Sequence, residues 1–176
     1  MADYLKNIYN ELKINAGIKS KLSVLTYRLF FISKFEIQNI GLKKIILIIA
    51  YILKVICWIL SCGDIPPKDA FIDYGLRLPH AFCGIYINPK VKIGKNSVLF
   101  HNVTLGAIEK EDEYIVDINI GNNVYIGTGA IVLGKVNIGN NCKIGAGALI
   151  INRTIKSNHT VINKVSIKEL DNKNGH

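Results

Sequence analysis

The sequence is sparing with cysteine, and its cysteines do not form the patterns of a disulfide scaffold or a zinc site. The four are Cys57, Cys62, Cys83 and Cys142, and none belongs to a CxxC motif. We therefore expect free thiols in a reducing compartment and no metal cofactor. The first long apolar run begins only near residue 45. No signal peptide is expected from this arrangement, and a cytoplasmic location is predicted.

Acidic residues are scarce in the first third of the chain. Residues 1–62 hold nine Lys/Arg and three Asp/Glu, a net charge of +6, whereas the remaining 114 residues carry only +3. Such a basic segment suits nucleic acid, an anionic membrane or an acidic polymer. The chain has no RNP box and no zinc-finger pattern. Nucleic acid is therefore not expected among its partners.

Proline is missing from residues 1–62, and apolar residues recur there at three- and four-residue spacing. This pattern predicts an N-terminal α-helical segment. Residues 45–60 are apolar apart from Lys54, with Trp58 near the end. Sixteen residues with a central charge fall short of a membrane span. Two alternatives stay open: a helix packed within the protein, or a helix that makes peripheral contact with the inner face of the cytoplasmic membrane.

After residue 62 the sequence has a period of six. Small or β-branched residues follow the aliphatic anchors at a fixed spacing, and glycine often comes directly after an anchor. Each hexad makes one short strand and one corner of a triangular coil, so three hexads make a coil. Twelve anchors predict a parallel β-helix of about four coils. The anchors are Ile72, Leu78, Ile87, Ile93, Leu99, Leu105, Ile120, Ile126, Val132, Ile138, Ile144 and Ile150.

These patterns divide the chain into a helical segment at 1–62, a β-helix at 63–166 and a tail at 167–176. The period breaks twice, by three extra residues between Leu78 and Ile87 and by nine between Leu105 and Ile120. Residues 106–119 are therefore predicted to loop out of the β-helix, and insertions of this kind tend to mark the working face. The predicted loop is acidic through Glu109, Glu111, Asp112, Glu113 and Asp117.

The repeat also predicts a column of residues along one edge. Leu78, Leu99, Ile126 and Ile144 begin strands on the same face, so the residues two places later stack in successive coils: His80, His101, Thr128 and Ala146. An imidazole above small residues suits an extended thioester, with His80 as the base for an acceptor hydroxyl. The alternative for His80 is an ordinary turn histidine. Three roles stay open for His101: a second catalytic group, a partner that fixes the tautomer of His80, or a polar residue that only fills its place in the column.

With these residues in view, the chain resembles the hexapeptide-repeat acyltransferases, in particular their serine acetyltransferase-like branch and its sugar and polysaccharide O-acetyltransferases. The resemblance covers about residues 64–150. The matching segments are Asp64-Ile-Pro-Pro, Gly75-Leu-Arg-Leu-Pro-His80, Gly84-Ile-Tyr-Ile-Asn88-Pro89, His101-Asn-Val-Thr-Leu-Gly106, Ile120-Gly-Asn-Asn-Val-Tyr-Ile-Gly127 and Ile144-Gly-Ala-Gly-Ala148.

The resemblance implies a left-handed β-helix, a homotrimer, and acetyl-CoA as co-substrate in a groove between neighbouring subunits. It implies that His80 is the general base and that Asp64 assists it, although one extra residue separates the two here. Gly106, Thr128 and Ala146 fall on backbone positions that contact the cofactor. Charge alone suggests Lys143 or Lys156 as the partner of a CoA phosphate.

Departures from the serine acetyltransferase pattern bear on the acceptor. Pro79 stands where those enzymes place an Asp that recognises the amino acid, residues 106–119 lack their Arg-His pair, and residues 163–166 lack their Gly-x-Pro-Ala. The hypothesis is therefore an O-acetyltransferase for a sugar hydroxyl in surface polysaccharide or lipopolysaccharide synthesis. Serine O-acetylation and a non-catalytic β-helix scaffold are the alternatives. A zinc enzyme like the gamma-class carbonic anhydrases is disfavoured, because only His80 and His101 are suitably placed.

Overall fold

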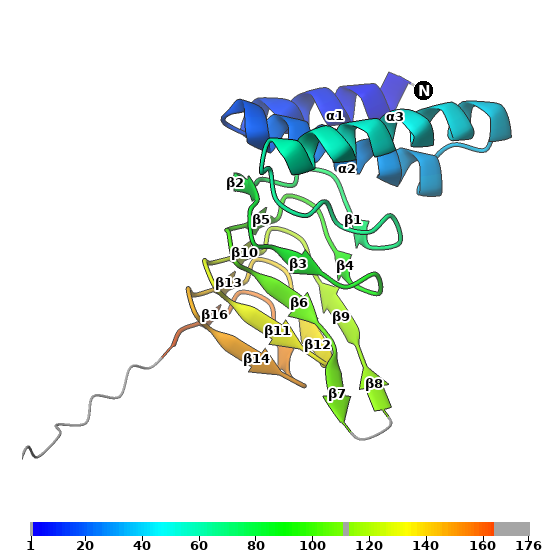
Figure 1. Ribbon diagram of the computed structural model, residues 1–176. Coiled ribbons are helices and arrows are strands. Elements are labelled where there is room, and N and C mark those ends of the chain that lie inside the picture. Colours follow the sequence, from blue (N-terminus) through cyan, green and yellow to red (C-terminus); the bar gives the residue numbers. More distant parts are fainter. Residues whose placement is uncertain (1, 111–112, 164–176) are drawn as a thin grey trace, which may run out of the picture.

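The computed structural model describes residues 2–110 and 113–163. Glu111, Asp112 and the predicted tail at 167–176 lie outside the described residues, as do residues 164–166. The predicted N-terminal helical segment consists of three helices, which lie across one end of a parallel β-helix (Figure 1). They are α1 (Ala2–Ile14), α2 (Ile18–Phe35) and α3 (Ile40–Ile59), and α2 packs against both other helices and against β2 (Pro79–Phe82).

The β-helix has three parallel sheets, one for each side of the triangle. The first sheet contains β1 (Phe71–Ile72), β4 (Lys92–Ile93), β9 (Asp117–Ile120), β12 (Lys135–Ile138) and β15 (Thr154–Ile155). The second contains β5 (Val98–Leu99), β10 (Tyr125–Ile126), β13 (Lys143–Ile144) and β16 (Thr160–Val161). The third contains β3 (Tyr86–Ile87), β6 (Thr104–Gly106), β11 (Ile131–Leu133) and β14 (Leu149–Ile151).

The aliphatic anchors of the six-residue period form the core in the predicted register. In the first sheet Ile72 pairs with Ile93, Ile93 with Ile120, Ile120 with Ile138, and Ile138 with Ile155. Ile72, Ile93, Ile120 and Ile138 are buried. The left-handed β-helix is confirmed, but it has about five turns rather than four. After Ile150 the spacing shortens once to five residues, at Ile155, and Val161 follows six residues later; both belong to a fifth coil.

The corners of the coils are held by asparagine side chains. Asn123, Asn141 and Asn158 adopt positive φ angles of 56°, 57° and 64°, a region that asparagine tolerates better than most residues. Their side chains form a ladder in which Asn123 Nδ2 donates to Asn141 Oδ1 and Asn141 Nδ2 donates to Asn158 Oδ1, each at 3.0 Å. Asn123 and Asn141 therefore each support both their own turn and the turn of the next coil.

The insertion after β6 is a hairpin and not an open loop. Its strands are β7 (Ile108–Lys110) and β8 (Glu113–Ile115), which pair antiparallel and project away from the helices (Figure 1). The predicted range of 106–119 was too wide, because Gly106 ends β6 and Asp117 already pairs with Lys135 in the first sheet. Burial of Ile118 in the core explains why the ladder resumes this early.

Two of the three faces of the β-helix, those of the first and third sheets, differ in polarity. Outward positions of the first sheet carry Lys92, Asn119, Asn137 and Thr154 in register. Outward positions of the third sheet carry Tyr86, Thr104, Ile131 and Leu149 in register, and Leu149 is 61% exposed. A row of exposed aliphatic and aromatic side chains on one face of a solenoid is typical of an interaction surface.

The helices cover the open edge of the first coil, whose backbone would otherwise lack partners. The Arg28 guanidinium donates to the carbonyls of Ile72 at 2.6 Å and Asp73 at 2.7 Å, and it pairs with the Glu11 carboxylate. Glu11 Oε1 also accepts from the Leu76 N–H at 2.6 Å. Both charged side chains are fully buried, so each depends on the other for its neutralisation.

Two neutral side chains complete this cover. Asn15 Oδ1 accepts from the Leu78 N–H at 2.7 Å, and Asn15 Nδ2 donates to the Leu76 carbonyl at 2.8 Å. The Tyr27 hydroxyl donates to the Ala70 carbonyl at 2.8 Å and accepts from the Ile72 N–H at 3.0 Å. Burial raises the pKa of Tyr27 well above its ordinary value, so its hydroxyl stays protonated and keeps both roles.

Candidate active site

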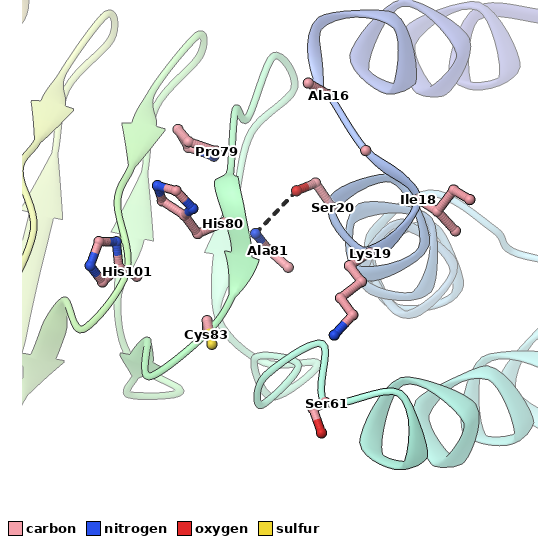
Figure 2. Close-up of a pocket in the computed structure, with 11 residues that line it drawn as sticks. Ala16, Ile18, Lys19, Ser20, Ser61, Pro79, His80, Ala81, Cys83 and His101 are labelled. Carbon is pink, nitrogen blue, oxygen red and sulfur yellow. Dashed lines mark hydrogen bonds between the residues drawn. The ribbon is translucent and has the colours of Figure 1, made fainter.

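A cavity of about 640 Å³ lies where the start of α2 meets the first two coils (Figure 2). One wall comes from residues 16–20, at the turn between α1 and α2. The other wall comes from β2 and the next coil. Its lining residues are Ala16, Gly17, Ile18, Lys19, Ser20, Ser61, Pro79, His80, Ala81, Cys83 and His101. We refer to it as the His80 cavity.

His80 and His101 lie against each other in this cavity. Their ring centroids are 4.8 Å apart with an interplanar angle of 87°, and the His80 ring also lies 6.1 Å from the ring of Phe100. His80 is exposed, whereas His101 is partly buried and its Nδ1 has no hydrogen-bond partner among the described residues. The edge-to-face contact positions the His80 ring and leaves it accessible. An accessible imidazole at a cavity wall can accept a proton from a bound hydroxyl.

The backbone places the predicted column as the repeat requires. The Gly129 N–H donates to the His101 carbonyl at 3.1 Å, and the Gly147 N–H donates to the Thr128 carbonyl at 2.8 Å. His101, Thr128 and Ala146 therefore lie on three successive coils. Among the described residues, no hydrogen bond engages the N–H groups of Thr128 and Ala146. The column thus offers two free donors and small side chains below the imidazoles, which suits an extended polar ligand.

The local fold of β2 explains why His80 is presented here. Ala81, directly after His80, has a φ of 55°, which is costly for a residue with a Cβ atom and must be held by its surroundings. Ser20 of α2 supplies one support, because its Oγ accepts from the Ala81 N–H at 3.1 Å (Figure 2). The first turn of α2 is thereby tied to the strand that carries His80.

Other predicted site residues lie elsewhere in the chain. Asp64 does not line the His80 cavity; it is exposed in a separate hollow of about 300 Å³ beside α3, together with Lys54 and Trp58. Ser61, where the chain turns, lines the His80 cavity, and Asp64 does not. The backbone of Gly63, the preceding residue, forms a parallel bridge with Phe82. Asp64 and His80 therefore line different hollows, and the role of Asp64 beside the base stays a prediction.

Gly106 and the two lysines are also outside the column. Gly106 is the last residue of β6, so it lies at the end of that strand away from the corner that carries His101. Lys143 is exposed on the outer surface of the second sheet, between Tyr125 and Thr160. Lys156 is exposed in the turn between β15 and β16. Their contacts with CoA remain predictions from the sequence.

The sequence patterns missed the contribution of α2. Lys19 extends from α2 toward the side of the cavity where Cys83 and Ser61 lie (Figure 2). It is the one cationic side chain among the described residues that line the cavity, and no acidic residue lines it. Nothing in the local sequence marks Lys19, because its place depends on how α2 docks. Within the same described part, no three His, Cys, Asp or Glu side chains come close enough to hold a metal ion.

Comparisons with known proteins agree on the repeat and the architecture. Residues 117–152 match the family described as "Bacterial transferase hexapeptide (six repeats)". No curated protein sequence matches the chain. Among solved structures, the serine acetyltransferase of Neisseria gonorrhoeae is 29% identical with a TM-score of 0.61, over 83% of this chain and 52% of its own.

Two further serine acetyltransferases show the same likeness. The soybean enzyme complexed with serine is 25% identical with a TM-score of 0.61, over 81% of this chain and 55% of its own. Serine acetyltransferase 1 of Entamoeba histolytica has a TM-score of 0.67 at 20% identity, over 90% of this chain and 62% of its own. The chain thus spans little more than half the length of several of these structures. The chain therefore carries the hexapeptide repeat over residues 117–152 and is similar in architecture to the serine acetyltransferases.

Proposed function

We propose that this protein is an acetyl-CoA-dependent O-acetyltransferase for a sugar hydroxyl, acting in surface polysaccharide or lipopolysaccharide synthesis. The observation that carries the proposal is the accessible His80 imidazole, held against His101 at the wall of a cavity and at the head of a column with free N–H donors. The likeness to serine acetyltransferases supports acetyl transfer as the reaction class.

The proposed chemistry needs one base and a set of hydrogen-bond donors. The imidazole of His80 accepts the proton of the acceptor hydroxyl as its oxygen attacks the thioester carbonyl. Backbone N–H groups stabilise the negative charge on that carbonyl oxygen. The carbon–sulfur bond then breaks, the new ester leaves on the sugar, and His80 returns the proton to the CoA thiolate. Free N–H groups at Thr128 and Ala146 suit the amide-rich arm of acetyl-CoA.

The lining of the cavity bears on the choice between a sugar and serine. A free amino acid carries both a carboxylate and an ammonium group, and each needs a partner of opposite charge. Lys19 would pair with the carboxylate. Lys19 and the likeness to serine acetyltransferases are the case for serine as the second candidate. No acidic residue lines the described cavity to serve the ammonium group, and Pro79 stands beside His80. A neutral sugar requires neither partner.

Replacing Lys19 by methionine tests this choice. For a neutral sugar we expect KM for the acceptor to change by less than about threefold, because no ion pair is lost. For serine, loss of a charge-assisted contact would raise KM by roughly tenfold or more. CoA release would be measured with L-serine and with a panel of sugars. Lys21→Met is the matched control, since Lys21 is exposed on the same helix but does not line the cavity. Efficient serine turnover by the natural chain would overturn the sugar assignment.

A homotrimer is part of the proposal. It is supported by the apolar outer row of the third sheet, which borders the corner that carries His101 and Thr128. In a trimer a neighbouring copy covers this row, and the column becomes one wall of a groove between subunits. The protein would work in the cytoplasm at the inner face of the membrane, which its N-terminal helices contact peripherally.

Leu149→Glu is expected to break the trimer, because it places a charge without a partner on an apolar interface. Sedimentation velocity should show monomers, and acetyl transfer should fall by roughly tenfold or more once the intersubunit groove is lost. Asn137→Glu is the matched control on the polar first sheet and should leave the trimer intact. An unchanged sedimentation coefficient for Leu149→Glu would contradict this use of the third sheet.

A further inference from the structure

Helix α3 has an apolar side that none of the described residues covers. Only Ala50 and Cys57 of its twenty residues are buried, on the side that faces α2. The opposite side is aliphatic along its whole length, with exposures between 38% at Ile56 and 66% at Ile59. Seven residues make up this side, which we call the outer face of α3: Ile45, Ile48, Ile49, Ile52, Val55, Ile56 and Ile59. None of the described helices is long and apolar enough to span a bilayer.

The border of the outer face has the composition of a membrane–water boundary. Lys44, Tyr51 and Trp58 follow one another at seven-residue spacing, so they lie in a row along one edge. Trp58 is 76% exposed and Tyr51 is 52% exposed. Amphipathic aromatic rings and long cationic side chains favour the headgroup level of a bilayer.

The charge of α3 decides between a bilayer and a second copy of the chain. The helix carries Lys43, Lys44 and Lys54 and no acidic residue; Asp64 is the acidic group that shares a hollow with Lys54. Lys44 borders the outer face, whereas Lys43 and Lys54 lie on other sides of the helix. Two copies paired through this face would lack the facing carboxylates that normally flank a helix pair. Anionic lipid headgroups supply the missing negative charge. The face therefore suits an anionic lipid surface better than itself.

The same helix leads directly to the His80 cavity. Trp58, Ile59 and Leu60 are all exposed at its C-terminal end, and Ser61, the next residue, turns the chain with a φ of 52° and lines the cavity. The cavity wall opposite His80 is the start of α2, which packs along α3. A surface that contacts the end of α3 thus lies beside the cavity.

We infer that the outer face of α3 docks on an anionic lipid bilayer and holds the His80 cavity at the bilayer surface. This inference rests on the proposed function for its chemical consequence, which is the class of acceptor. A cavity held at a bilayer takes a saccharide anchored in that bilayer by a lipid, in preference to a sugar free in solution. The aliphatic face enters the headgroup and acyl boundary, while the row of Lys44, Tyr51 and Trp58 stays at the headgroup level.

The single tryptophan of the chain makes docking directly measurable. With vesicles containing about 30% phosphatidylglycerol, Trp58 emission should shift to shorter wavelength and be quenched by brominated acyl chains, whereas purely zwitterionic vesicles should give a much smaller change. Ile52→Glu, at the centre of the outer face, should lower the bound fraction by roughly tenfold or more. Ile162→Glu is the matched control, because Ile162 is 70% exposed at the other end of the β-helix.

Cys83 makes the position of the cavity measurable as well. It is the exposed one of the four cysteines and lines the His80 cavity, whereas Cys57, Cys62 and Cys142 are buried. A fluorophore on Cys83 should transfer energy to acceptor dyes on the lipid headgroups in the wild-type background and not in Ile52→Glu.

Each outcome of these measurements decides the inference, and none requires acetyl transfer. If anionic vesicles do not change the Trp58 emission, the inference that α3 docks on a bilayer is overturned. A loss of oligomeric mass in Ile52→Glu without lipid would show that a second copy covers α3. Docking without energy transfer from Cys83 would place the cavity away from the bilayer and remove the argument for an anchored acceptor. Failure of the acetyltransferase proposal would instead show itself as no CoA release, with docking intact.

Discussion

Replacing His80 by alanine is expected to lower acetyl transfer by roughly 10²–10⁴-fold, the usual contribution of a general base. The side chain is exposed at the cavity wall, so its removal should leave the fold and the affinity for CoA nearly unchanged. The rate would be followed as release of the CoA thiol from acetyl-CoA with the best sugar acceptor. The loss should appear in kcat, because the imidazole accepts the proton in the transition state and does not contribute to binding of the ground state.

Matched variants separate this role from a general effect of losing a histidine. His159→Ala should keep full activity, because His159 is an exposed residue near the last coil whose ring contacts the Ser157 carbonyl. His101→Asn should cost less than His80→Ala, since His101 contacts the His80 ring but is itself partly buried. Full activity of His80→Ala would exclude it as the base. Failure of the natural chain to bind CoA in calorimetry would favour the non-catalytic scaffold.

Removing the carboxylate of Glu11 is expected to lower the free energy of unfolding by about 3–5 kcal/mol. Arg28 would then keep its charge while fully buried and without a counter-ion, and the Leu76 N–H would lose its acceptor. Glu11→Ala would be compared with the natural chain by denaturant unfolding at one fixed protein concentration, because an oligomer gains stability with concentration.

The chain offers a close control for this prediction. Lys34 and Asp69 form its other described ion pair, at 2.9 Å, and their side chains are 44% and 49% exposed. Lys34→Ala should change the free energy of unfolding by less than about 1 kcal/mol, because water screens an exposed pair. Equal losses for the two variants would refute the distinction between the buried and exposed pairs. Glu11→Ala should also lower acetyl transfer, since Arg28 belongs to the helix that forms one wall of the His80 cavity.

Local periodicity was enough to predict most of the β-helix. Each coil repeats the same contacts, so an aliphatic residue every six positions predicts both the core and the register of one coil on the next. The pairing of Ile93 with Ile120, across the inserted hairpin, shows that the register survives an interruption. The same count placed His80, His101, Thr128 and Ala146 along one edge. The prediction was wrong about where the insertion ends, at the start of β9, and about the number of coils, because the six-residue spacing is interrupted near both places.

The placement of Asp64 shows the limit of this approach. Its assignment as the partner of His80 depended on resemblance at the junction between the helices and the first coil, where no repeat sets the register. In the structure the backbone of Gly63 pairs with Phe82, and Asp64 lines the hollow beside α3. The partly buried His101 is instead the ring that contacts His80.

By itself, the sequence determined the repeating coil, the spacing of the histidine column and the proline directly before His80, because each follows from neighbours along the chain or from a fixed period. Only the tertiary structure decided how the helices sit on the first coil. That docking depends on buried contacts between residues far apart in sequence, such as Arg28 with Ile72 and Ser20 with Ala81. It brings Lys19 and Ser61 into the His80 cavity and leaves the outer face of α3 uncovered. The six-residue period therefore places the histidine column along one edge of the β-helix. The second wall of the His80 cavity comes from α2, whose position the period does not specify.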